Sequence, residues 1–292
     1  ILVPLYNTPE QFLREMVESV QAQTYGNWEL CMADGSDDEH SNIEKICRNY
    51  VKKDRRIKYR KLNENRGISN NTNACIEMAI GEYIALLDHD DLLAPNALFE
   101  NAIAIEETNA DVLYSDEDHL TIGGKHVNPF YKPDWSPDLL YSQMYICHFL
   151  VVKKTIFENL GGFRSEYNGS QDYDLVLRLS EQTNRICHIP LILYTWRESE
   201  NSTANNADAK PYAHIAGKKA LEEHLKRKYG SNAYVEDGEY TFTYDAHFLA
   251  IEKPLVSIII PMKDKWEPSF LLMLTISKFF LKYQKHPSVE AV

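Results

Sequence analysis

An apolar run that ends in carboxylates is the segment whose residue types are best suited to chemistry. Residues 85–91 read Ala-Leu-Leu-Asp-His-Asp-Asp, which places Asp88 and Asp90 two positions apart at the end of an expected buried strand. In extended backbone such residues share a face, and open α/β sheets bind ligands at the carboxyl ends of their strands. Carboxylate oxygens are also the ligands that Mg²⁺ and Mn²⁺ prefer. The segment predicts a site for a divalent cation and its accompanying phosphates, the alternative being a plain polar turn.

Residues at other strand ends predict a nucleotide beside this cation. The first three expected strands end near an aromatic ring, an aspartate and an arginine, and a parallel sheet would gather these ends at one edge. There the ring can stack on a base, the aspartate can accept a hydrogen bond from a pyrimidine N3–H, and the arginine can offset phosphate charge. The residues concerned are Tyr6, flanked by Pro4 and Asn7, then Asp34, and then Arg66.

The elements that must position these residues alternate between strand-like and helix-like patterns. This alternation predicts an α/β fold with a mostly parallel central sheet flanked by helices. For the first helix we expect Thr8 as the N-cap and Pro9 at the first helical position. Residues 122–145, rich in glycine, proline and aromatics, are expected to form an irregular binding loop. The expected strands are 1–5, 28–33, 57–62, 82–87, 112–114 and 186–195, and the later helices are 41–52, 70–80, 95–108, one starting near 172, and 213–228.

The bulk composition excludes several classes of protein. Over 292 residues the formal net charge is −12, which argues against broad nucleic-acid binding, since this needs a basic face. The five cysteines form no C-x-x-C pair, and we interpret them as reduced thiols of a cytosolic protein. No stretch reaches the ~20 apolar residues of a membrane-spanning helix. We therefore expect no transmembrane segment, and a nucleotide rather than a nucleic acid as partner.

The end of the chain repeats the layout of its beginning. Residues 258–264 read Ile-Ile-Ile-Pro-Met-Lys-Asp and precede an apolar helical pattern at 270–281, as residues 1–7 precede a helix. A generic strand-to-helix start would look the same. We interpret the echo as the start of a second domain.

Taken in chain order, the motifs resemble those of family 2 inverting glycosyltransferases with the GT-A fold. The resemblance covers about residues 1–204. The later motif Ser-Asp-Glu-Asp at 115–118 is most similar to bacterial enzymes that build surface polysaccharides, some of which carry two such domains in tandem. The segments that carry the resemblance are 3–7, 33–36, 65–67, 88–91, 161–163, 171–175 with Arg178, and 196–197.

The resemblance implies a Rossmann-like GT-A catalytic domain over residues 1–205. A C-terminal helical extension would follow over 206–252, and residues 253–292 would begin a second, truncated glycosyltransferase domain. The implied cofactor is Mn²⁺ or Mg²⁺, and the implied partners are a nucleotide-sugar donor and a glycan or lipid-linked acceptor. We expect a cytoplasmic enzyme, with the inner face of the plasma membrane as a place where it could act peripherally.

The resemblance also assigns roles within the site. Asp172 matches the family's catalytic base, although the helix dipole favours a carboxylate at a helix start whatever its function. Asp90 would hold the metal and Asp88 would meet the ribose. Where many relatives place a histidine this chain has Ser199, which leaves His148 as a candidate third metal ligand. The base of the donor would contact Tyr6 and Asp34, and Arg66 would lie near the base and the phosphates. Arg197 would brace the diphosphate. Further contacts with the donor are expected from Pro4, Asn7 and His89.

Together these assignments predict transfer of a sugar with inversion, from a UDP-sugar by preference or a dTDP-sugar, to an acceptor hydroxyl. A sugar-nucleotide nucleotidyltransferase is one alternative, but residues 4–10 contain no glycine where such enzymes carry a glycine-rich loop. A non-catalytic carbohydrate-binding or calcium-binding module is another. Its acidic run would be 34–44, which has Glu39 where an EF-hand loop needs glycine.

Overall fold

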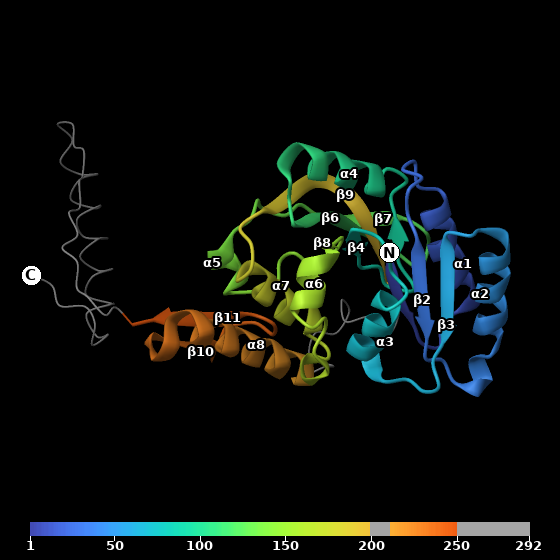
Figure 1. Ribbon diagram of the computed structural model, residues 1–292. Coiled ribbons are helices and arrows are strands. Elements are labelled where there is room, and N and C mark those ends of the chain that lie inside the picture. Colours follow the sequence, from blue (N-terminus) through green and yellow to red (C-terminus); the bar gives the residue numbers. More distant parts are fainter. Residues whose placement is uncertain (199–210, 250–292) are drawn as a thin grey trace, which may run out of the picture.

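Three parallel strands with helices on both faces form the amino-terminal half of the protein (Figure 1). The computed structural model describes residues 1–198 and 211–249. Alternate residues of a strand face opposite sides of the sheet. Val3 and Met32 pack with α1 and α2 on one face, while Leu2 and Cys31 pack with α3 on the other. The elements are β1 (Leu2–Leu5), α1 (Glu10–Gln21), β2 (Leu30–Asp34), α2 (Asn42–Lys53), β3 (Ile57–Lys61) and α3 (Gly67–Ile76).

A second sheet of mixed direction completes the fold. Its strand order is β4-β8-β6-β9-β5, with β7 also paired to β6. Strands β6 and β9 are parallel, whereas the other pairs are antiparallel. A parallel bridge between Leu2 and Leu86 joins the two sheets. The strands are β4 (Tyr83–Ala85), β5 (Leu92–Leu93), β6 (Val112–Leu120), β7 (His126–Phe130), β8 (Val151–Lys153) and β9 (Ile186–Arg197).

The expectation of an α/β sheet flanked by helices is confirmed. Parallel pairing is concentrated in β1, β2 and β3 and in the β6–β9 pair. The remaining helices are α4 (Ala97–Thr108), α5 (Pro137–Leu140), α6 (Lys154–Asn159), α7 (Gln171–Ser180) and α8 (Pro211–Tyr229), with short 3₁₀ turns at Asp38–His40, Ser165–Tyr167 and Gly230–Asn232. Within the described ranges, no helix is long and apolar enough to cross a membrane.

Two local expectations are wrong. Thr8 does not cap α1, because the carbonyl of Pro9 accepts the first helical hydrogen bond, from the Leu13 N–H at 3.0 Å, and Pro9 is itself the N-cap. The segment 122–145 is also less irregular than expected. It contains β7, which pairs antiparallel with the far end of β6, and α5, whose first turn is capped by the Ser136 hydroxyl. Strand β6 consequently runs through the acidic motif at 115–118 instead of ending before it.

The C-terminal segment contains the expected helix and also a β-hairpin that the sequence did not predict. The helix α8 lies along α7 and is followed by β10 (Ala233–Asp237) and β11 (Tyr244–Phe248), which pair antiparallel (Figure 1). Helix α8 buries a face of small and aliphatic residues that includes Ala213, Ala220 and Leu225. The boundaries at 205 and 252 stay a prediction, and the expected second domain at 253–292 lies outside the described residues.

Candidate active site

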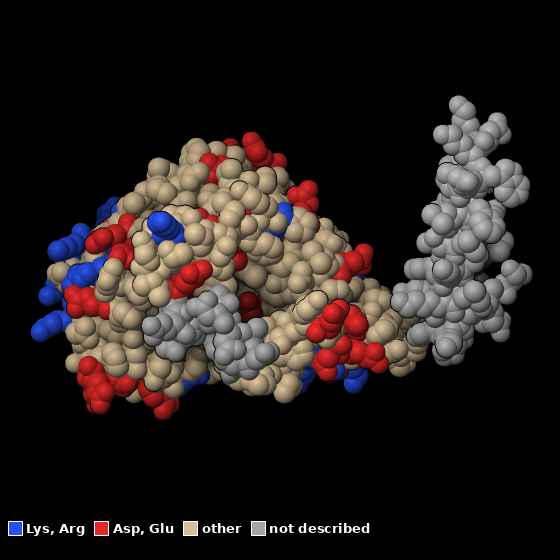
Figure 2. All heavy atoms as spheres, turned by 180° about the vertical axis from the view of Figure 1, so that it is seen from behind, with Lys and Arg blue, Asp and Glu red and all other residues tan. Residues whose placement is uncertain are grey.

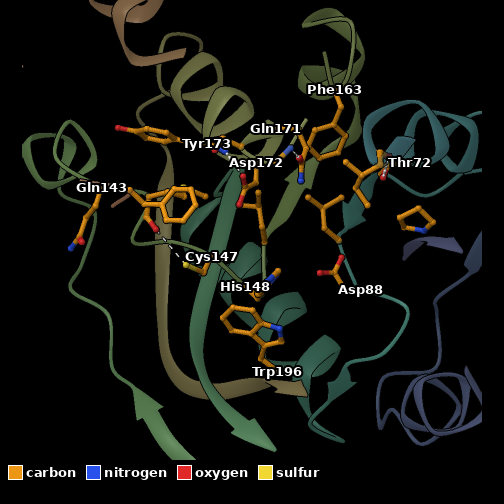
Figure 3. A pocket seen from close by; sticks show the side chains of 18 of the residues that line it. Thr72, Asp88, Gln143, Cys147, His148, Phe163, Gln171, Asp172, Tyr173 and Trp196 are labelled. Carbon is orange, nitrogen blue, oxygen red and sulfur yellow. Dashed lines mark hydrogen bonds between the residues drawn. The ribbon is translucent and has the colours of Figure 1, made fainter. Parts of the chain in front are cut away.

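A cavity of about 430 Å³ brings together segments from both halves of the protein. Asp88 after β4, Asp172 of α7 and Trp196 of β9 line it (Figure 3). Pro4 of β1 and the turn between β10 and β11 line it as well. The space-filling view shows a hollow in the molecular surface with acidic atoms at its bottom (Figure 2). Two residues predicted from different motifs, Asp88 and Asp172, therefore face one cavity.

Asp172 stands in the first turn of α7, where its surroundings favour a basic carboxylate. Burial raises the pKa of Asp172, and the Tyr173 N–H, which donates to Asp172 Oδ1 at 2.8 Å, offsets only part of that rise. The helix start is fixed by Ser170, whose hydroxyl donates to the Ala213 carbonyl at 2.7 Å. Gly169 before it has φ +96°, and an added Cβ would come within 2.7 Å of the Ala213 Cβ, so only glycine fits there. An aspartate held this way is a stronger proton acceptor than one in water.

Three side chains at the other side of the cavity are placed to hold a cation. Asp88, Asp91 and His148 each offer one ligand atom, and these atoms all lie within 4.8 Å of one another. Asp91 is close to Asp88 because the chain turns there, with the Asp91 N–H donating to the Asp88 carbonyl at 3.3 Å. Burial and then the charges of Asp88 and Asp90 raise the pKa of Asp91, as expected for carboxylates gathered in one place. Two carboxylates and an imidazole fit Mn²⁺ or Mg²⁺.

His148 is held in this cluster by an aromatic partner. Its ring stacks on Tyr194, with ring centres 4.4 Å apart and planes inclined by 11°. The Tyr194 hydroxyl donates to Asp91 Oδ2 at 2.6 Å, so the same tyrosine contacts two members of the cluster. Figure 3 shows His148 between Asp172 and Trp196, with Asp88 beside it. The geometry brings the candidate third ligand from the sequence to the carboxylates.

Asp90 does not belong to the group that the structure brings together. Its backbone carbonyl accepts a hydrogen bond from Arg197 Nε at 2.7 Å, and burial raises the pKa of its carboxyl group. Asp91 takes part instead, although its Oδ1 already accepts from the Arg197 N–H at 2.7 Å. The assignment of the metal to Asp90 stays a prediction. The carboxylate of Asp88 accepts no hydrogen bond from the residues described, which leaves it available to a ligand.

Of the residues predicted to bind the nucleotide, Pro4 lines the cavity. The others lie outside its lining, near the carboxyl ends of β1 and β2 and before α3, and they are Tyr6, Asn7, Asp34 and Arg66. Asp34 is completely buried, and it accepts hydrogen bonds from the Ser36 N–H at 2.8 Å and the Tyr59 hydroxyl at 2.7 Å. Tyr6 is 46% exposed, as a stacking platform requires. Arg66 lies on the surface in an ion pair with Glu64, and the Asn7 N–H donates to Ser36 Oγ at 2.9 Å. Their contacts with a donor stay predictions.

Arg197 and His89 have contrasting surroundings. Arg197 pairs with Glu15 at 2.5 Å and lies over the Phe12 ring at 4.4 Å, so its guanidinium joins β9 to α1. The ring nitrogen Nδ1 of His89 is buried and has no hydrogen-bond partner among the described residues. Buried polar atoms are nearly always paired in proteins. This unpaired nitrogen belongs to the residue that follows Asp88 in the chain.

Sequence reasoning missed two parts of the site. Asp91 lies in the carboxylate cluster, whereas the Asp-x-Asp spacing points to Asp88 and Asp90. The turn residues Thr241 to Tyr244 line the cavity although they follow α7 by a long stretch of chain. No local pattern marks them, since their role depends on how α8 returns the chain to the site.

An α/β sheet with a carboxylate-lined cavity at its edge is the arrangement of a glycosyltransferase of GT-A type. The family model "Glycosyl transferase family 2" matches residues 1–161, and the chain belongs to this family. It is 43% identical over 267 residues to the uncharacterized protein y4gI of Sinorhizobium fredii, covering 90% of this chain and 29% of that protein. It is 35% identical over 294 residues to the O-antigen biosynthesis protein RfbC of Myxococcus xanthus, covering 100% of this chain and 22% of that protein. The chain spans less than a third of the length of either relative.

Solved structures share the fold at low sequence identity. The complex of S. aureus TarS 1–349 with UDP-GlcNAc matches with a TM-score of 0.58 at 19% identity, over 78% of this chain and 71% of that one. The mannosyltransferase PcManGT from Pyrobaculum calidifontis, in complex with GDP-Man and Mn²⁺, matches with a TM-score of 0.55 at 17% identity, over 77% and 62% of the two chains. At these identities the likeness establishes the fold, which is that of GT-A glycosyltransferases.

Proposed function

We propose that this chain is an inverting, metal-dependent glycosyltransferase that acts in the synthesis of a cell-surface polysaccharide. The observation that carries the proposal is that Asp172 faces the same cavity as Asp88 and His148, two of the three residues of the candidate cation cluster. The donor is a UDP-sugar, with a dTDP-sugar as the second choice, and the acceptor is a hydroxyl of a glycan or of a lipid-linked sugar. The relative named for O-antigen biosynthesis supports the proposed role in polysaccharide synthesis. The UDP-GlcNAc complex of TarS supports the choice of a UDP-sugar as donor. We propose that the activity is cytoplasmic, with the inner face of the plasma membrane as a place where the enzyme could act peripherally.

The proposed reaction is a single displacement. Asp172 accepts the proton of the acceptor hydroxyl as the acceptor oxygen bonds to the anomeric carbon. The bond from that carbon to the phosphate oxygen breaks, and its electron pair leaves with the nucleoside diphosphate. Because attack and departure occur on opposite faces, the configuration at the anomeric carbon inverts. The raised pKa of Asp172 suits this role.

The residues that would hold Mn²⁺ or Mg²⁺ are Asp88, Asp91 and His148, with Asp90 as the candidate from the sequence motif. When bound, such an ion supplies positive charge that stabilises the departing diphosphate. The orphan Nδ1 of His89 adds a polar group for the donor at the same edge.

We place the acceptor at the opposite end of the cavity. Figure 3 shows Gln143 and Asp88 on opposite sides of Asp172, so the base lies between a donor side and a second compartment. Next to Gln143 in the chain, Met144 also lines the cavity, and the lining further includes Phe242 and the hydroxyl-bearing Thr243. A mixture of apolar surface and hydroxyl or amide groups suits the face and edge of a sugar ring.

A donor screen tests the proposal. The purified chain is supplied with UDP-, dTDP- and GDP-sugars with Mn²⁺, Mg²⁺ or a chelator, and release of nucleoside diphosphate is measured. We expect turnover of a UDP-sugar that the chelator abolishes. Asp172→Asn should lower the rate by about 10²- to 10⁴-fold, the usual contribution of a general base, and leave donor affinity unchanged. Asp88→Asn should weaken donor and metal binding.

A matched control is Asp138→Asn, since Asp138 is also in the first turn of a helix but is exposed and outside the cavity. It should behave like the wild type. Turnover by Asp172→Asn at the wild-type rate, or no metal-dependent binding of any nucleotide-sugar, would contradict the proposal.

A further inference from the structure

A buried lysine lies directly behind the candidate cation cluster. Lys132 follows β7, and its side chain has 0% exposure. Its Nζ donates to the carbonyls of Ser115 at 2.7 Å and Ile146 at 2.6 Å, contacts the carbonyl of His148, and pairs with Glu117 Oε2 at 3.0 Å. Burying an ammonium group is costly unless its donors are satisfied. Here the acceptors outnumber the three N–H donors, so the charge is fully solvated by protein.

Glu117, which pairs with Lys132, also contacts His148. Its Oε2 accepts a hydrogen bond from the His148 N–H at 3.0 Å as well as the ion pair from Lys132. The backbone carbonyl of His148 contacts Lys132 Nζ. Both backbone polar groups of His148 are thus bound by the two side chains of one buried ion pair.

The ion pair also ties together three stretches of chain. Ser115 and Glu117 belong to β6, Lys132 follows β7, and Ile146 and His148 precede β8. The Lys132 N–H further donates to Asp116 Oδ1 at 2.9 Å. The segment that carries His148 is irregular and belongs to no helix or strand. Its position next to Asp88 and Asp91 therefore depends on side-chain contacts.

We propose that Lys132 and Glu117 are positioning residues that hold the His148 ring at the cation site. The inference rests on the proposed function, since it assumes that His148 is a metal ligand. A metal ligand must be held to within about 0.5 Å of its working position. An apolar pair of similar volume would stabilise the fold as well as a buried ion pair does, or better. The pair, unlike apolar side chains, binds both backbone groups of His148 and so sets where the ring projects.

The test is the affinity for Mn²⁺, measured from the electron paramagnetic resonance signal of the free ion, with Mn²⁺ alone and with UDP. We expect His148→Ala to weaken Mn²⁺ binding, and Lys132→Met to weaken it by about tenfold or more. In the double variant with His148→Ala, Lys132→Met should add little, because the pair acts through that ring. Glu117→Gln keeps an acceptor for the His148 N–H and should lose less than Lys132→Met.

A second variant guards against loss of the fold. Lys132→Met leaves Glu117 buried without its counterion, which is strongly destabilising. Combining Lys132→Met with Glu117→Gln makes the pair neutral, and this variant should fold and still bind Mn²⁺ more weakly than the wild type. The matched control is Lys58→Met, which breaks the partly buried pair with Glu29 at 2.5 Å, away from the cavity lining. It should leave Mn²⁺ affinity unchanged.

The outcomes separate this inference from the proposed function. If His148→Ala weakens Mn²⁺ binding while the folded Lys132 variants bind as the wild type does, the positioning role is wrong and the cation site stands. If His148→Ala binds Mn²⁺ normally, His148 is not a ligand and the inference falls with that assignment. If the wild type binds no Mn²⁺, both the inference and the metal dependence are overturned.

Discussion

At the scale of single residues, burial sets the chemistry of the carboxylates. Asp91 is fully buried and Asp172 is partly buried at the cavity wall, and their partners differ. Asp91 accepts hydrogen bonds on both oxygens, from Tyr194 and Arg197, and so is held in place among like charges. Asp172 lines the cavity and accepts a hydrogen bond on Oδ1 from the Tyr173 N–H. The first arrangement favours a bound cation, and the second favours a proton acceptor.

The pH dependence of the reaction follows from Asp172. Burial raises the pKa of its carboxyl group above the ordinary value of 3.8. Because the base must be deprotonated, kcat/KM should decrease as the pH is lowered, with a midpoint above pH 3.8. The Asp172→Asn variant should not show this decrease at acidic pH. A profile of kcat/KM against pH at saturating Mn²⁺ measures it. An acidic midpoint at or below 3.8 would show that the titrating group is not this buried carboxyl.

At the scale of elements, the β10–β11 hairpin forms one wall of the cavity. Its turn is seated on α8, where the Phe242 N–H donates to His214 Nδ1 and the Tyr244 hydroxyl donates to the His214 carbonyl, each at 3.0 Å. Tyr244 also stacks on Tyr173, next to Asp172, with ring centres 5.8 Å apart. Helix α8 thus delivers an aromatic turn to the side of the base that we assign to the acceptor.

Shortening Phe242 should therefore affect the acceptor and spare the donor. We expect Phe242→Ala to raise the acceptor KM by about two- to tenfold, the equivalent of ~0.5–1.5 kcal/mol of aromatic contact. Hydrolysis of the donor without acceptor should stay at the wild-type rate. Tyr240→Ala, in the same turn but 68% exposed and outside the cavity, is the control. An equal change of the acceptor KM in both variants would show that the hairpin does not contribute to the acceptor site.

At the scale of the whole molecule, one ionic group joins the C-terminal helix α8 to the end of α7, the helix that carries Asp172. Glu181, directly after α7, accepts hydrogen bonds from His224 Nδ1 and Arg227 of α8, each at 2.7 Å. Burial raises the pKa of Glu181, but these hydrogen bonds outweigh it and lower the pKa from 4.5 to about 2. The two helices are therefore held together by a charge that favours the folded state.

This linkage has a defined pH window. Since the folded-state pKa is depressed, the stabilisation is complete above pH 4.5 and is lost as pH falls toward 2. Glu181→Gln should lower the free energy of unfolding by roughly 1–3 kcal/mol at about pH 7, and by less at about pH 3. Urea unfolding at both pH values measures the difference, with the exposed Glu222→Gln of α8 as control. An equal loss of unfolding free energy at both pH values would show that the Glu181 carboxylate charge is not the source of the stabilisation.

The alternation of strands and helices over about residues 1–114, and the residues at those strand ends, could be predicted from the sequence by itself, whereas β5, β7, β8 and the β10–β11 hairpin could not. Periodicity and turn chemistry are local properties, so the alternation of elements and the positions of Asp88 and Asp172 could be inferred without coordinates. The errors lie where distant parts of the chain decide the structure. Strand β6 extends through 115–118 because β7 and β9 pair with it, and no local pattern carries that information.

Only the tertiary structure decided how the site is assembled. A turn after β4 brings Asp91 rather than Asp90 toward Asp88, and a buried ion pair brings His148 to both. The hairpin wall depends on α8 packing against α7. These contacts join residues far apart in the chain, and their energies come from burial and pairing that exist only once the chain has folded. The sequence thus determined which chemical groups are present, and packing determined which of them meet.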